Sequence, residues 1–207
     1  MTAQKLAFDG GTPVRATPMP PRIGFGPEEE KELMECISHY RNLDSDPPYI
    51  GLWNKRFSEA FAEYQGGGFS LPVSSGTGAI YVSLASLGLP KGSTVLTSPV
   101  TCSGVLGSIQ ALGFVPKVVD SAPSSFNVDA EQVKARISKD VRCLLVTHAA
   151  GEPVDVPAIR DAIKAVGLSI QKILRLFARH SVTLTVVNQF GDRRRTHIYS
   201  NYRQVGE

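Results

Sequence analysis

Five small residues in the first half of the chain have the types and spacing of a phosphate-binding turn. The segment 74–78 (Ser-Ser-Gly-Thr-Gly) follows an apolar run at 69–73, typical of a buried strand, and precedes apolar residues at helical spacing. The first turn of a helix attracts phosphate because its N–H groups lack partners and its dipole is positive there. Gly76 and Gly78 would let the backbone approach closely, and Thr77 and the serines would add hydroxyl donors. An ordinary N-cap on a crossover helix has the same pattern, so this segment alone supports both readings.

The elements that would position this turn alternate between strand and helix. Apolar runs and helical periodicity predict strands at 93–98, 114–119, 141–147 and from 168 onward, and helices at 103–112, 129–137 and 156–166. This alternation predicts an α/β fold with a doubly wound, mostly parallel sheet and helices on both faces. Ligands of such sheets bind at the carboxyl ends of the strands. The Gly76 turn, the segment 99–103 and His148 all fall there.

The region before the turn contains an arm and two helices. Residues 1–26 are rich in glycine and proline and predict an extended arm. Pro27 and three glutamates after it open a helix, with Leu33, Ile37 and Tyr40 as its apolar stripe. Aromatic residues at 53, 57, 61 and 64 predict a second amphipathic helix, and a stripe of this kind usually packs in the core.

Composition indicates an ordinary globular protein with an unusual end. Three widely spaced cysteines (Cys36, Cys102, Cys143) form neither a metal pattern nor a disulfide framework, which favours a reducing cytoplasm and predicts no metal site. The 207 residues hold no apolar run long enough to span a bilayer, and no signal peptide is expected at the start. The net charge of +3 hides a break near residue 170, because residues 171–207 contain seven Lys/Arg against two Asp/Glu. Beyond Ile170 the apolar pattern fails as well, although 183–187 could form a strand in isolation.

Several ordered motifs resemble those of the DegT/DnrJ/EryC1/StrS family of sugar aminotransferases, pyridoxal-phosphate (PLP) enzymes of the aspartate-aminotransferase fold. The resemblance covers residues 6–170. It rests on GGTPVR at 10–15, FSEAFAEY at 57–64, SSGTGA at 74–79, Asp120 with FNVD at 126–129, and HAAGEPVD at 148–155. It implies a partial large domain of that fold, followed by an irregular tail.

The resemblance also implies which residues bind the cofactor. Thr77 and Gly78 would hold the PLP phosphate through backbone N–H groups and the threonine hydroxyl, and Gly76 belongs to the same expected cofactor-binding set. Family members commonly place an aromatic residue over the cofactor ring at the position that Cys102 occupies here. A thiol stacks less well than an aromatic ring, and Cys102 could instead be a buried small hydrophobe.

The catalytic groups of the family are not found in this chain, so no catalytic residue is assigned. PLP chemistry needs a lysine that binds the cofactor covalently and a carboxylate beside the pyridine nitrogen. Neither motif is present, and Lys172 reads as a surface lysine. We therefore expect an N-terminal arm at 1–26, an incomplete PLP-binding large domain at 27–170 and an aberrant basic tail at 171–207.

A shifted reading frame would explain the tail. Residues 171–176 can be encoded so that a frame displaced by two bases reads Glu-Asp-Ser-Gln-Ala-Ile, close to the missing carboxylate motif. The competing interpretation is a genuine divergent tail with a basic patch.

The resemblance predicts a truncated, inactive relative of an aminotransferase that acts on nucleotide-linked keto-sugars in polysaccharide or antibiotic-sugar biosynthesis. Intact relatives would use glutamate or glutamine as donor and form homodimers, while this chain would bind PLP weakly or not at all. The alternative is a binding or regulatory protein that contacts nucleic acid through Arg193, Arg194, Arg195 and neighbouring basic residues, although no recognition-helix motif accompanies them. A dinucleotide-binding oxidoreductase is disfavoured because the turn is not G-x-G-x-x-G. The family's dehydratase branch, in which histidine replaces the lysine, stays open.

Overall fold

The computed structural model describes residues 5–18, 25–64, 67–166, 172–177 and 196–200; for the last two segments it describes the backbone only. These residues fall into two compact units that divide between Pro47 and Pro48. The domain boundaries expected at 26/27 and 170/171 remain predictions.

The first unit contains a 3-10 turn, η1 (Ala7–Asp9), and one long helix, α1 (Pro27–Arg41). The helix begins as predicted, with proline in its first turn and the side chain of Glu29 accepting the Gly26 N–H at 2.6 Å. The apolar stripe exists, but no residue of α1 is buried: Leu33 is 52% and Ile37 45% exposed.

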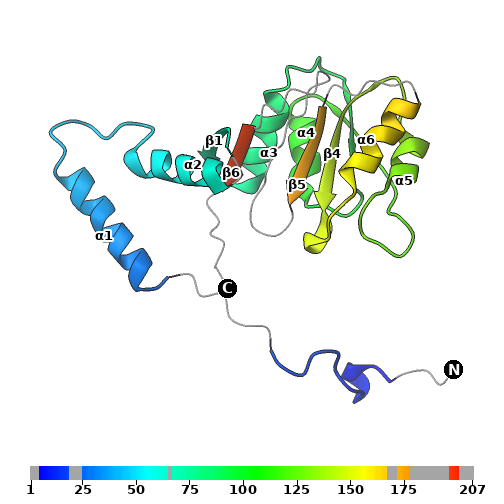
Figure 1. Cartoon of the computed structure of the whole chain (residues 1–207), viewed down its shortest axis with the longest axis horizontal. Coiled ribbons are helices and arrows are strands. Elements are labelled where there is room, and N and C mark those ends of the chain that lie inside the picture. The colour runs from blue at the N-terminus through cyan, green and yellow to red at the C-terminus, as the bar shows by residue number, and fades with distance from the viewer. Residues whose placement is uncertain (1–4, 19–24, 65–66, 167–171, 178–195, 201–207) are drawn as a thin grey trace. The chain divides into compact units, whose positions relative to one another are not determined.

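The second unit alternates helix and strand along most of its length (Figure 1). Its elements are α2 (Leu52–Tyr64), β1 (Phe69–Val73), α3 (Gly76–Ala85), β2 (Thr94–Thr97), α4 (Ser103–Ala111), β3 (Val115–Val118), α5 (Ala130–Arg136), β4 (Val141–His148), the 3-10 turn η2 (Ala149–Gly151), α6 (Val156–Ala165), β5 (Lys172–Phe177) and β6 (Thr196–Ser200). Between residues 69 and 166 every predicted helix and strand is confirmed.

A four-stranded parallel sheet in the order β3-β2-β4-β5 forms the centre of this unit. Helices cover both of its faces (Figure 1). Val95, Cys143 and Leu145 pack with buried residues of α3 and α4, whereas Leu96, Leu144 and Val146 pack with α5 and α6. The predicted α/β fold with a doubly wound parallel sheet is therefore confirmed.

The strand before the central turn differs from the prediction. β1 pairs in parallel with β6 in a separate two-stranded sheet, and its side chains alternate between exposed and half-buried. Phe69 is 83% exposed, so the prediction of a buried strand is wrong. Among the described strands, β1 pairs only with β6 and lies outside the central sheet, whose strands hold the buried core.

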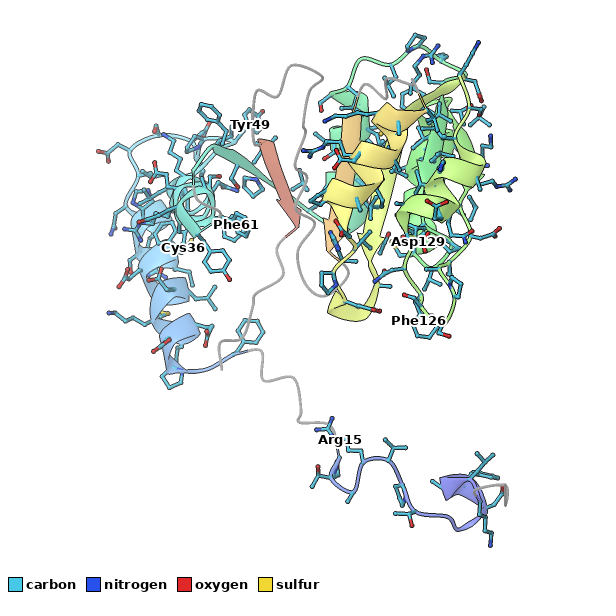
Figure 2. The ribbon with its side chains drawn as sticks, turned by 45° about the vertical axis from the view of Figure 1, so that its right-hand side comes forward. Arg15, Cys36, Tyr49, Phe61, Phe126 and Asp129 are labelled. Atoms are coloured by element: carbon cyan, nitrogen blue, oxygen red, sulfur yellow. The ribbon has the colours of Figure 1, made fainter. Side chains whose placement is uncertain are left out.

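The aromatic stripe of α2 is likewise not part of the core. Trp53, Phe57 and Phe61 are half-buried and Tyr64 is 70% exposed, so the core assignment for this stripe is wrong. The Phe57 and Phe61 rings pack against each other along this helix, with their centroids 6.0 Å apart. Figure 2 labels Phe61 on α2.

Two strands lie inside the segment 171–207, where the sequence predicted an irregular tail. β5 begins at Lys172 and pairs with β4 along Cys143–His148. The start expected for this strand at residue 168 lies outside the described residues. Apolar residues within β5 (Ile173, Leu174, Leu176 and Phe177) supply a strand signal that Lys172 and Arg175 interrupt. The possible strand at 183–187 and the arginines at 193–195 lie outside the described residues. Within the described part of the chain, no helix is long and apolar enough to cross a membrane.

Candidate cofactor site

The first turn of α3 is built as a capped helix start. Ser75 has extended backbone angles, and its hydroxyl accepts the N–H of Gly78 at 3.0 Å. This is the N-cap interpretation of the turn. Among the described residues, the N–H groups of Gly76 and Thr77 have no hydrogen-bond partner, and Thr77 is exposed. The turn therefore keeps two free donors and a hydroxyl at the positive end of the helix.

The first turn of α4 lies directly against this turn. A Cβ atom built on Gly104 would overlap the hydroxyl oxygen of Thr77 and lie 3.2 Å from both Thr77 Cβ and Cγ2. The Ser108 hydroxyl, one turn further along α4, donates to the Thr77 carbonyl oxygen at 3.4 Å. Two helix starts from different βα units thus meet at Thr77 and Gly104.

Hydroxyl groups join this junction to the carboxyl ends of two central strands. The Thr147 hydroxyl, near the end of β4, donates to the Thr101 hydroxyl at 3.0 Å, just before α4. The Thr147 N–H donates to the hydroxyl of Ser98, which directly follows β2. The Gly76 turn therefore reaches the strand tips through α4, although β1 itself is outside the central sheet.

Cys102 is the N-cap residue of α4, and its side chain makes no capping hydrogen bond. The residue is exposed, so the alternative of a buried small hydrophobe is wrong for this cysteine. The buried cysteine is Cys143, in the core under α3 and α4. Cys102 precedes Gly104 by two residues at the start of α4.

The loop after β4 is held by two side chains. His148 Nδ1 accepts the N–H of Val154 at 2.9 Å. The buried side chain of Asn127 accepts the N–H of Ala149 at 2.8 Å and donates to the carbonyl of Glu152 at 3.0 Å. Figure 2 labels Phe126, which precedes Asn127 in the sequence, and Asp129, the N-cap residue of α5.

The junction suits a phosphate group better than a metal ion. Free N–H groups, a hydroxyl and a helix dipole all favour an anion. Across the residues whose side chains are described, no three His, Cys, Asp or Glu side chains lie close enough to hold a metal. The sequence predicted Gly76, Thr77, Gly78 and Cys102 as cofactor contacts, and that role stays a prediction. The N–H of Gly78, predicted to hold the phosphate, is donated to the Ser75 hydroxyl instead. Sequence reasoning missed Gly104 and the bracing role of Asn127. The motif FNVD contained Asn127 without showing what it binds, and nothing local distinguished Gly104 from Gly107.

A doubly wound parallel sheet with helices on both faces defines the class of this protein as α/β. The particular family follows from its sequence: the chain belongs to the DegT/DnrJ/EryC1/StrS aminotransferase family, whose model matches residues 31–172.

Individual proteins agree with this assignment. The chain is 30% identical over 161 residues to the L-glutamine:2-deoxy-scyllo-inosose aminotransferase of Streptomyces lividus, a match that covers 76% of this chain and 37% of that protein. Its fold resembles an aminotransferase structure from Psychrobacter cryohalolentis, with a TM-score of 0.67 and 20% identity over 80% of this chain and 41% of the other. It also resembles 3-amino-5-hydroxybenzoic acid synthase, with a TM-score of 0.67 and 23% identity over 78% and 40% of the two chains. The chain thus spans about two fifths of the length of these proteins.

Proposed function

We propose that this chain is the cofactor-binding part of a PLP-dependent aminotransferase and that Gly76, Thr77, Gly78 and Cys102 contact PLP. The observation that supports this proposal is the meeting of the α3 and α4 helix starts at Thr77 and Gly104, beside the ends of β2 and β4. When bound, PLP supplies an electron sink for amino-group transfer.

The three residues of the α3 turn have different roles in this proposal. Gly76 and Thr77 donate their free N–H groups, and Thr77 adds its hydroxyl. The N–H of Gly78 is already donated to Ser75, so Gly78 contributes room instead. A Cβ there would lie 3.3 Å from the Ser75 hydroxyl oxygen and would crowd the cap.

The substrate class follows from the relatives. The name of the Streptomyces lividus protein specifies L-glutamine as amino donor and a deoxy-inosose, a polyhydroxylated cyclic ketone, as acceptor. This name supports glutamine or glutamate as the donor and a cyclic polyhydroxy ketone as the acceptor. Within that class we propose a nucleotide-linked keto-sugar. Because the chain is proposed to be inactive alone, parallel binding measurements with a nucleotide-linked keto-sugar and a free keto-cyclitol test this choice.

We further propose that the chain does not transfer amino groups by itself, because the catalytic lysine and the ring-nitrogen carboxylate are not found in it. The nucleotide sequence around codon 170 tests the frameshift explanation. If another frame cannot encode Glu-Asp there, the explanation is wrong. The nucleic-acid alternative depends on basic side chains outside the described residues, and no observation favours it.

Protection of Cys102 from alkylation tests the proposed site. Pyridoxamine phosphate is the suitable probe, because it carries the phosphate and ring but no aldehyde that could react with surface lysines. We expect it to slow iodoacetamide labelling of Cys102 several-fold, while pyridoxamine without phosphate does not. Half-buried Cys36, in the other compact unit, is the internal control. Equal labelling of Cys102 with and without the probe would overturn the proposal.

A further inference from the structure

The contact between Gly104 and Thr77 depends on the absence of a side chain at position 104. A Cβ on Gly104 would collide with the Thr77 hydroxyl oxygen and would lie 3.2 Å from two further Thr77 atoms. Gly107, one turn along the same helix, has no atom within 4 Å of the corresponding position. The two glycines therefore differ sharply in what a methyl group would meet.

The surroundings leave the Thr77 side chain as the group that must move. α4 is fixed against the core by Val105 and Ile109, both fully buried, and Ser108 donates to the Thr77 carbonyl. On the other side, Ala79 and Ile80 anchor α3 in the same core. Thr77 itself is exposed, so its side chain has room to rotate. Because the side chain is β-branched, such a rotation would take it to one of only a few other χ1 rotamers. A methyl group at position 104 would therefore turn the hydroxyl away from its present position.

We propose that Gly104 is a positioning residue, whose missing side chain keeps the Thr77 hydroxyl directed for contact with the phosphate of the cofactor. This inference rests on the proposed function, because the phosphate is that of PLP. It assigns a role to a residue that does not itself contact the ligand.

The test compares binding of pyridoxamine phosphate and pyridoxamine by calorimetry to the full chain and its variants. The ratio of the dissociation constant of pyridoxamine to that of pyridoxamine phosphate measures the contribution of the phosphate group. A general loss of stability weakens the binding of both ligands and does not change this ratio. We expect Gly104→Ala to reduce this ratio about tenfold, the value of one hydrogen bond to a charged group. Gly107→Ala is the matched control and should keep the wild-type ratio, since alanine is the better helix former at both positions.

A double-mutant cycle separates positioning from simple disruption. Thr77→Ala removes the hydroxyl, so adding Gly104→Ala to it should leave the ratio unchanged. Should Gly104→Ala alone fail to fold, the double variant still tests the proposal, because only one tight contact of 3.2 Å remains when residue 77 is alanine, and its ratio should equal that of Thr77→Ala.

The outcomes distinguish the two proposals. A wild-type chain that binds neither ligand, or binds both equally, overturns the proposed function. A wild-type preference that Gly104→Ala leaves intact, or a double variant whose ratio falls below that of Thr77→Ala, overturns the role of Gly104 alone.

Discussion

His148 Nδ1 accepts a hydrogen bond from the backbone N–H of Val154 at 2.9 Å, across the tight loop that connects β4 to α6. Both residues are buried, with His148 4% and Val154 8% exposed. Because the ring nitrogen acts as an acceptor, its proton is carried on the other nitrogen in the neutral ring. The bond closes the loop immediately after Thr147, which contacts Thr101 at the proposed site.

Replacing His148 should reveal the value of this bond. In His148→Leu the Val154 N–H stays buried without its acceptor, which should lower the free energy of unfolding by about 1–3 kcal/mol. His148→Asn retains an acceptor near the Nδ1 position and should lose less. Urea unfolding of both variants measures the difference, and equal losses would argue against a role for the acceptor.

Asn127 should brace the same loop, because its amide satisfies a backbone donor and a backbone acceptor together. Asn127→Ala would leave the buried Ala149 N–H unpaired and should cost about 1–3 kcal/mol of stability. Ser121→Ala removes only a 3.5 Å hydrogen bond in an exposed loop and should change stability by less than about 0.5 kcal/mol. Thermal unfolding followed by circular dichroism compares the two, and similar melting temperatures would contradict the assignment.

Asp140 should make stability depend on pH in the acid range. Hydrogen bonds from the Ser138 and Thr94 side chains lower the pKa of this carboxyl from 3.8 to about 2, and Thr94 donates at 2.6 Å. Because the folded chain favours the charged form, the stabilisation is complete above about pH 4 and disappears as the pH falls towards 2. Melting temperatures of the wild type and Asp140→Asn should therefore differ near neutral pH and converge in acid. A constant difference across this range would be the contrary result.

Asp129 should stabilise α5 through its cap. Its carboxylate accepts the N–H of Gln132 at 2.8 Å, and the helix contributes Val133 to the core. Asp129→Ala should cost about 0.5–2 kcal/mol, whereas Asp129→Asn keeps an acceptor and should cost less. Chemical denaturation separates the two variants, and an unchanged midpoint for Asp129→Ala would show that the cap contributes nothing.

The central elements could be predicted from the sequence because each carries its own signal. The strand at 94–97, the helix capped by Asp129 and the apolar strand at 141–148 are marked by apolar runs, caps and glycine stops within a few residues. Their positions in the layers follow from alternation alone.

Burial and contact across the chain could not be predicted in the same way. Phe69 is exposed because β1 lies outside the central sheet, and strand order is not a local property. Thr77 and Gly104 are 27 positions apart, so no spacing pattern joins them. The exposure of Cys102 is also not a local property, because it depends on where α4 starts relative to the ends of the strands.

The two inner strands carry aliphatic side chains towards both helix layers, with Val95 and Leu96 on β2 and Leu144 and Leu145 on β4. A shift of one residue between such strands would replace one apolar side chain with another on each face. Hydrophobicity alone therefore specifies the register of these strands only weakly. The hydrogen bond from the Thr147 hydroxyl to the Thr101 hydroxyl has no equivalent in a shifted arrangement, because Val146 or His148 would then occupy that position. Thr147, at the end of β4, therefore favours one register between β2 and β4. The end of the sheet that we propose for the cofactor is also the end that favours this register.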